Sequence, residues 1–130
     1  MADIVVSAWD AFGMQDAFDV LRSEFGSEPG SFMLALYADR VWDPGAFSRL
    51  EQAMRVACEE CAQRESLERW LVEGFHYVST WVPDHTGHPA FPRPEPASYY
   101  EACLIRLTDL ADWFFHGWHT YQEPHYWQPL

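Results

Sequence analysis

The chain has 130 residues, about the size of one ordinary domain, and 48% of them are hydrophobic and 17% aromatic. This composition is sufficient to form a core, so it excludes intrinsic disorder for most of the chain. Eight basic residues against twenty acidic ones give a formal net charge of −12, which argues against a general binder of nucleic acids or anionic membrane surfaces.

No apolar run approaches the roughly 18 residues that a membrane span requires. Residues 1–10, MADIVVSAWD, have neither the basic start nor the long apolar stretch of a secretory signal peptide, so we expect a cytoplasmic protein. All eight basic residues are arginine, and neither lysine nor asparagine occurs. Because those two amino acids use A-rich codons, their absence is typical of a GC-rich genome and favours a bacterial origin.

The first half of the chain carries apolar residues at intervals close to 3.6 positions, which predicts helices. The first predicted helix covers residues 9–25 and ends before Gly26, and a shorter one covers residues 32–41. A third helix follows. Asp43 can cap its first turn, and Pro44 suits the first helical position.

The second half predicts two further helices. One begins at Glu65 or Ser66 and runs to Val82, and the last covers residues 98–115. Residues 83–96, between them, contain five prolines. Because proline excludes regular helix there, this segment predicts a stiff, partly extended crossing.

These elements predict an all-α fold. We expect a single domain over residues 1–130, formed by a bundle of four to five helices with the proline-rich crossing before the last helix. The tail from Gly117 is irregular and rich in aromatic residues, so we expect it to pack back on the bundle.

Two motifs with the spacing of metal or redox sites have a simpler interpretation. Glu73 and His76 share the Glu-x-x-His spacing of di-iron bundles, but helical geometry places both away from the apolar stripe of their helix. Cys58 and Cys61 form a C-x-x-C in mid-helix, with Cys103 as the one remaining cysteine. A structural zinc site takes four ligands, so we expect a solvated helix face for the first motif and core packing for the cysteines.

Two histidine pairs carry a stronger signal. His85 and His88 lie in the proline-rich crossing, and His116 and His119 lie at the end of the last helix. Four imidazoles could form a tetrahedral zinc site or a nickel site. The alternative is that they cap helices or fill polar edges, and His116 suits a helix C-terminus, where a cation interacts favourably with the dipole.

The sequence contains no G-x-S-x-G motif and no glycine-rich phosphate loop, so we expect binding rather than catalysis. Acidic residues off the apolar stripes, Glu51 among them, predict a docking face for a basic protein partner, since carboxylates steer such a partner and nearby rings anchor it. The alternative is a solvated face that keeps the protein dispersed. The predicted partner-binding residues are Glu59, Glu60, Glu73, Asp109, Asp112 and Trp113.

In its length, acidity and aromatic content the chain resembles the small acidic immunity proteins that bacteria encode beside their own toxins. The most distinctive segments are GFHYVSTWVPDHTGHPAFPRP, residues 74–94, and SYYEACLIRL, residues 98–107. The resemblance implies an inhibitor that covers the active site of a cationic nuclease or another toxin, without catalysis of its own. Two alternatives remain, a metal-binding protein or metal-dependent enzyme, and a general interaction or structural domain, which could form a homodimer through its aromatic C-terminal region.

Overall fold

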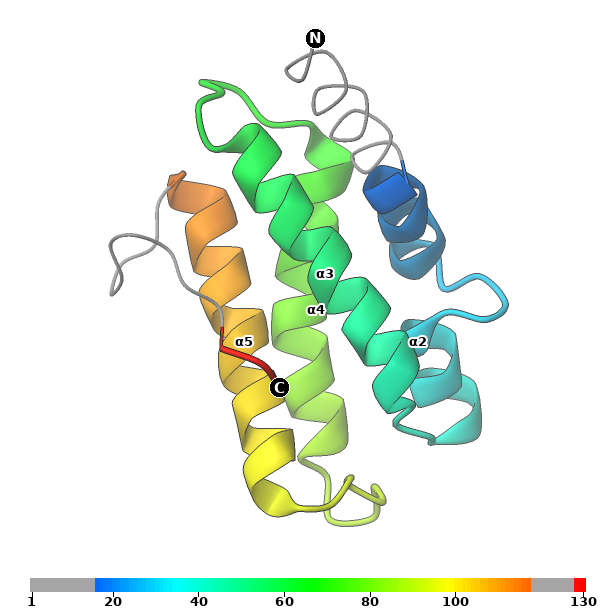
Figure 1. The fold of residues 1–130 in the computed structure, drawn as a ribbon. Helices are drawn as coiled ribbons and strands as arrows, with labels where there is room; N and C mark the ends of the chain where they lie inside the picture. The colour runs from blue at the N-terminus through cyan, green and yellow to red at the C-terminus, as the bar shows by residue number, and fades with distance from the viewer. Residues whose placement is uncertain (1–15, 118–127) are drawn as a thin grey trace, which may run out of the picture.

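Every regular element in the described part of the chain is a helix, which confirms the predicted all-α bundle of four to five helices (Figure 1). The computed structural model describes residues 16–117 and 128–130. In chain order the elements are a helix over residues 16–25, α2 (Phe32–Leu34), the π-helix η1 (Ala35–Asp39), α3 (Pro44–Cys61), α4 (Arg69–Thr86) and α5 (Ala97–His116).

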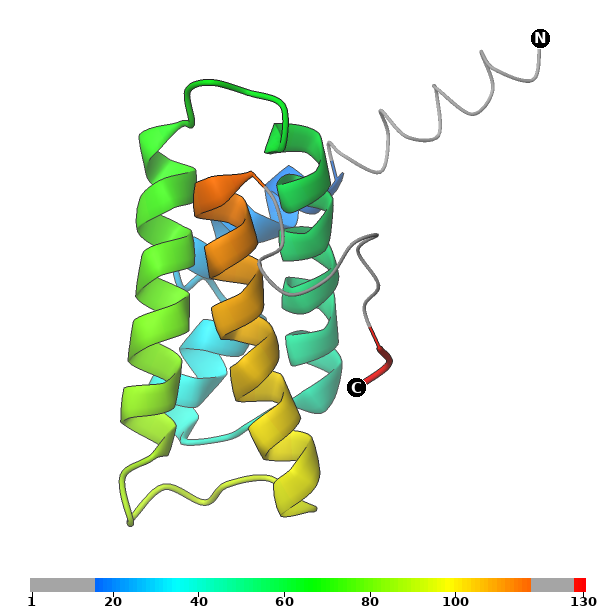
Figure 2. The same cartoon turned by 90° about the vertical axis from the view of Figure 1, so that its left-hand side faces the viewer.

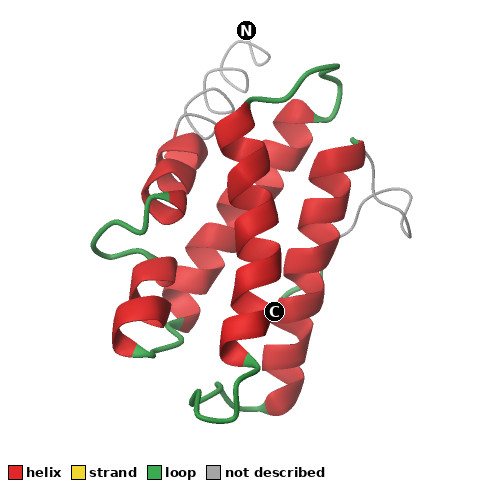
Figure 3. Cartoon of the chain, turned by 180° about the vertical axis from the view of Figure 1, so that it is seen from behind, coloured by secondary structure: helices red, strands yellow, loops and turns green. Residues whose placement is uncertain are grey.

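The three long helices run antiparallel in succession, so α3 and α5 end at the end of the bundle where α4 begins (Figure 1). α5 covers one side of the α3–α4 pair, and the helix over residues 16–25 covers the opposite side together with α2 and η1 (Figure 2). From behind, α4 faces the viewer between α5 and these N-terminal elements (Figure 3). Within the described residues, no helix combines the length and apolarity that crossing a bilayer requires.

The core between these helices is built largely from aromatic rings. Phe75 of α4 and Phe114 of α5 stack with their ring centres 4.0 Å apart. Phe47 of α3 contacts Phe32 of α2, with ring centres 5.3 Å apart, and so joins the N-terminal side to the same core. All four side chains are almost fully buried, and burial of each contributes about 1.5–3 kcal/mol to folding.

The predicted start of the third helix is confirmed. The Asp43 carboxylate accepts hydrogen bonds from the backbone N–H groups of Gly45 and Ala46, at 3.0 and 3.2 Å, and Pro44 is the first helical residue. α5 lies within one residue of its prediction at each end. Residues 9–15 of the first predicted helix, and most of the aromatic tail, lie outside the described residues.

Two predicted boundaries of α4 were wrong. The helix begins at Arg69 instead of Glu65 or Ser66, because residues 62–68 form a connection whose first turn closes with a hydrogen bond to the carbonyl of Cys61. It also continues through Pro83 to Thr86, although proline has no N–H to donate within the helix.

The turn after Pro83 is stabilised by other groups. The Thr86 hydroxyl donates to the carbonyl of Val82 at 2.7 Å, and the N–H of Gly87 donates to the carbonyl of Pro83 at 2.9 Å. Val82 and Thr86 are fully buried, so core packing also holds this turn. The proline-rich crossing is therefore shorter than predicted and covers residues 87–96.

The short predicted helix over residues 32–41 is also modified. It is formed by α2 and the π-helix η1, and it ends at Arg40, whose φ of 56° lies in the left-handed region. Its N-terminus is held by Glu24, whose buried carboxylate accepts the N–H groups of Phe32 and Met33 at 2.8 and 3.1 Å. Burial raises the pKa of Glu24, although these two hydrogen bonds and the charge of Arg49 act in the opposite direction.

Glu51 was predicted to face outward, and the structure buries it at 4% exposure. Its Oε1 atom lies 2.5 Å from a guanidinium nitrogen of Arg106 on α5 and 2.9 Å from Nε of Arg55. Arg106 also donates to the carbonyl of Gln128. Two guanidinium groups on one carboxylate offset the desolvation of the carboxylate, so this network can join α3 to α5 inside the bundle.

We expect Glu51→Gln to lower the free energy of unfolding by about 3–5 kcal/mol, because it leaves buried guanidinium charge beside a neutral amide. Glu60→Gln is the matched control on the same helix, since Glu60 pairs with Arg64 at the surface, and we expect a loss of about 0–1 kcal/mol. Urea unfolding followed by circular dichroism measures both. Equal losses would contradict a structural role for the buried pair.

Glu24 predicts a pH dependence of stability. Its pKa in the folded state is raised above the ordinary value of 4.5, so the folded state holds this proton more tightly than the unfolded chain does. The contribution of Glu24 to stability therefore falls as the pH rises from about 4.5 through the raised pKa, by at most about 1.4 kcal/mol per pH unit. Urea unfolding between pH 4 and 7 should show this slope in the native chain and in Glu28→Gln, but not in Glu24→Gln. Parallel curves for all three would refute it.

Candidate functional site

A row of four side chains follows one side of α4 at four-residue intervals, and we call Glu73, Tyr77, Trp81 and His85 the α4 row. The rings of Tyr77 and Trp81 are stacked with centres 5.7 Å apart and an interplanar angle of 15°. Trp81 and His85 continue the stack at 4.4 Å and 12°. The α4 row therefore consists of three nearly parallel rings with an exposed carboxylate at its N-terminal end.

The helix over residues 16–25 covers α4 immediately before this ring stack. Gly74 allows the close approach, since a Cβ atom at this position would lie 2.1 Å from the ring of Phe25. Phe25 also contacts the rings of Trp70 and Phe75, each with centres 6.1 Å apart. The guanidinium carbon of Arg22 lies 4.0 Å from the centre of a Trp70 ring, a cation–π contact.

The second half of the row is only partly covered. Tyr37 of η1 contacts Trp81 with ring centres 6.4 Å apart, and it is the most exposed large hydrophobic side chain of the described residues, at 69%. Tyr77 is 47% exposed. We call Tyr37, Tyr77 and Trp81 the aromatic patch. Its rings come from two elements, and only their mutual packing and the fold of η1 bring them together.

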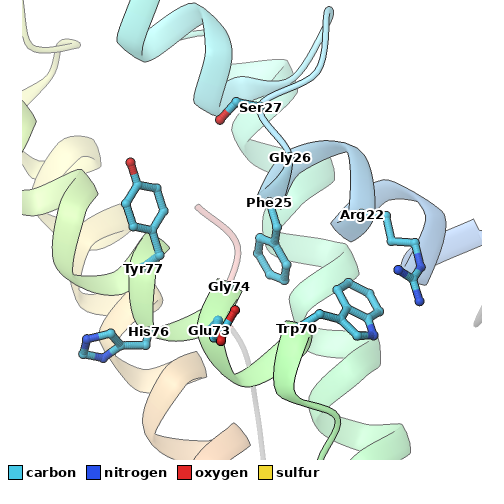
Figure 4. Close-up of a pocket in the computed structure, with 9 residues that line it drawn as sticks. All are labelled: Arg22, Phe25, Gly26, Ser27, Trp70, Glu73, Gly74, His76 and Tyr77. Carbon is cyan, nitrogen blue, oxygen red and sulfur yellow. The ribbon is translucent and has the colours of Figure 1, made fainter.

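Two depressions adjoin the aromatic patch. The larger, of about 700 Å³, lies between the helix over residues 16–25 and α4, and we call it the α4 groove. Tyr77 and Phe25 stand on its two sides with Glu73 and Gly74 between them, whereas His76 points away (Figure 4). The smaller depression, of about 280 Å³, lies at the C-terminal end of α4. It is lined by Arg40, Asp84, His85, His88, Ala90 and Phe91.

The structure gathers five of the predicted partner-binding carboxylates toward one end of the bundle. Glu59 and Glu60 lie in the last turn of α3, Asp109 and Asp112 in the last two turns of α5, and Glu73 in the second turn of α4. These turns meet at the same end because α4 is antiparallel to α3 and α5 (Figure 1). These five carboxylates give this end of the bundle negative charge, part of which is offset by Arg64, which pairs with Glu60.

The sixth predicted residue, Trp113, was placed wrongly. It is 4% exposed and belongs to the core, so it is no surface anchor. α5 packs against both α3 and α4, and its buried face is therefore wider than a single apolar stripe and includes Leu110 as well as Trp113.

The structure does not bring the histidine pairs together. His85 and His88 lie at the C-terminal end of α4, whereas His116 ends α5 at the opposite end of the bundle, roughly 30 Å away along a 20-residue helix. Two of them have local polar contacts: His88 accepts the N–H of Ala90 at 3.1 Å, and Nδ1 of His116 lies 3.1 Å from the carbonyl of Asp112.

His119 lies outside the described residues. Among the residues that are described, no group of three or more histidine, cysteine, aspartate or glutamate side chains is arranged to hold a metal ion. A single site that includes His85, His88 and His116 is therefore incompatible with the fold.

The other two motifs behave as predicted. Glu73 and His76 are both exposed, and Cys58, Cys61 and Cys103 are all buried free thiols. Burial raises the pKa of each thiol, to about 11 for Cys103, so they remain protonated near neutral pH and are poor nucleophiles.

The aromatic patch was not predicted from the sequence. The four-residue interval from Glu73 to His85 could have indicated the α4 row. The prediction for this helix instead relied on its apolar stripe, which forms the buried face. No sequence signal marks the approach of Tyr37, because it depends on the π-helical turn after α2.

The contact between Gly74 and Phe25 can be tested directly. We expect Gly74→Ala to lower the free energy of unfolding by about 1–3 kcal/mol, because the added methyl group displaces the Phe25 ring. Gly45→Ala in the first turn of α3 is the control, since its Cβ meets the Asp43 carboxylate at an ordinary 3.5 Å. The urea midpoint measures both. A Gly74→Ala protein as stable as the native chain would show that Phe25 does not occupy this position.

No family model, curated protein or solved structure matches the chain. The interpretation of the α4 row, the α4 groove and the aromatic patch therefore depends on their own geometry. They offer exposed ring surface, a carboxylate beside it and a concave face, which together suit recognition of another molecule.

Proposed function

We propose that the chain is a protein-binding domain of the inhibitory, immunity-protein kind, which docks a basic partner protein through the aromatic patch and the α4 groove. The observation that carries this proposal is the exposed aromatic patch beside the carboxylate of Glu73. An inhibitor of this kind acts by covering a partner, so it requires no catalytic group. Its proposed place of action is the bacterial cytoplasm.

The aromatic patch has the character of an interface anchor. Tyrosine and tryptophan are enriched among the residues that dominate binding energy, because they bury a large area and lose little side-chain entropy on binding. At 69% and 47% exposure, Tyr37 and Tyr77 leave ring surface in water that a partner would remove from it. Tyr77 stacks on Trp81, and Trp81 stacks on His85. This stacking holds the rings in place before binding, which lowers the entropic cost of docking.

Charge supports a basic partner. The net charge of −12 attracts cationic proteins at long range, and the acidic end of the bundle adjoins the α4 groove through Glu73. The same charge disfavours a second copy of this chain as the occupant, since two such surfaces repel each other.

The proposal can be tested by selecting displayed random 16-residue peptides on the native chain and sequencing those that bind. We expect peptides of net positive charge whose affinity falls at least about tenfold for Trp81→Ala and Tyr77→Ala, the loss typical of interface anchors. Ile105→Ala is the matched control, because Ile105 is an exposed aliphatic side chain, at 61%, on α5. Its affinity should stay at the native value.

The charged end provides a second comparison in the same assay. Glu59→Arg and Asp109→Arg should slow association of the selected peptides and leave helicity unchanged. Peptides without positive charge, or peptides that bind all variants equally, would overturn the proposal. Concentration-dependent dimerisation that disappears in Trp81→Ala would overturn it as well, in favour of self-association.

A further inference from the structure

The α4 groove places exposed ring surface beside an exposed carboxylate. Tyr77 is the terminal ring of the stack in the α4 row, so one of its faces is directed away from Trp81. Glu73, four residues earlier, lies where the next member of the row belongs, and Phe25 stands on the other side of the groove (Figure 4). A flat cation placed here would meet ring surface and a carboxylate together.

The chain already holds one guanidinium on a ring of this helix face. Arg22 lies 4.0 Å from the centre of a Trp70 ring at the edge of the same groove. Trp70 precedes Tyr77 by seven residues, two helical turns, so both rings are on the same side of α4. The contact shows that a guanidinium can pack on an aromatic ring of this face of α4.

We propose that the α4 groove binds an arginine side chain of the partner, with its guanidinium on the Tyr77 ring and paired with Glu73. This inference depends on the proposed function, since the arginine belongs to the docked protein. Glu73 has no hydrogen bond or ion pair to other described residues, so its carboxylate is available. The groove, of about 700 Å³, is large enough to admit an arginine side chain, so its volume does not exclude this occupant.

Arginine is preferred over lysine for a physical reason. The guanidinium is planar and weakly hydrated, and it can stack on a ring while its edge donates two hydrogen bonds to a carboxylate. The ammonium of lysine is a strongly hydrated point charge that cannot do both. Arg22, on the opposite edge of the groove, is held over Trp70 and leaves the Tyr77 side open to a second cation.

The experiment uses three short probes, Ac-Gly-Arg-Gly-NH2 and its lysine and citrulline analogues, titrated into the native chain and followed by NMR. We expect millimolar binding of the arginine probe, about five- to tenfold weaker binding of the lysine probe, and weaker binding still of uncharged citrulline. Glu73→Gln should weaken the arginine probe about three- to tenfold. Glu101→Gln removes an equal charge from an exposed position near the start of α5, away from the groove, and should have no effect.

Each other outcome overturns the inference. Equal binding of arginine and lysine probes, or equal effects of Glu73→Gln and Glu101→Gln, would show general electrostatic attraction in place of a site. No perturbation at 20 mM probe would show that the groove does not take the side chain.

The two proposals can fail separately. If replacement of arginine by lysine in the selected peptides leaves their affinity unchanged while Trp81→Ala still abolishes their binding, the result would support the docking surface and contradict the arginine site. If the arginine probe binds but no selected peptide depends on the aromatic patch, the docking proposal falls, and with it the partner as the source of the arginine.

Discussion

The contact of Phe25 with Gly74 determines how the surface of this bundle is divided. Because glycine has no Cβ, the helix over residues 16–25 lies directly on α4 and covers its first half. The chain then turns away, and the ring stack of the α4 row is only partly covered, by Tyr37 of η1. The α4 groove is the space at this boundary, so its position follows from one missing side chain.

Acidic residues serve two different purposes in this molecule. Glu24 and Glu51 are buried, and each is compensated locally, the first by two backbone N–H groups and the second by two guanidinium groups. A buried carboxylate without such partners would be expensive, so these two fix elements in place. The exposed carboxylates contribute little to stability individually, and their sum instead gives the protein a strong negative field.

Much of the fold could be predicted from local sequence. The cap formed by Asp43 and Pro44, the bounds of α5 and the all-α class all depend on periodicity and on residues close to one another in the chain. The burial of Glu51 could not be predicted in this way, because its partner Arg106 lies 55 residues further on. The helical turn after Pro83 likewise depends on buried contacts of Thr86 that proline rules do not include.

The candidate site likewise depends on contacts between residues far apart in the sequence. The sequence placed Glu73 in a motif with His76 and His85 in a pair with His88, whereas regular spacing on α4 places Glu73 and His85 in one row. Phe25, Arg22 and Tyr37 come from other elements, and only tertiary packing brings them to that row. A groove assembled from several elements leaves no pattern in any one of them.

The negative electrostatic potential at one end of the bundle and the ring contacts beside the α4 groove would affect different rates of binding. In the proposed complex, carboxylates at one end of the bundle would act over about a Debye length, roughly 8–10 Å, so they would raise the rate of encounter with a basic partner in a salt-sensitive way. The rings of Tyr77 and Trp81 act only in contact, and such contacts chiefly determine how slowly a complex dissociates. Glu73 belongs to both sets, since it lies at the acidic end and in the α4 groove. In the proposed complex, Glu73 would therefore contribute both to long-range attraction of the partner and to direct contact with it.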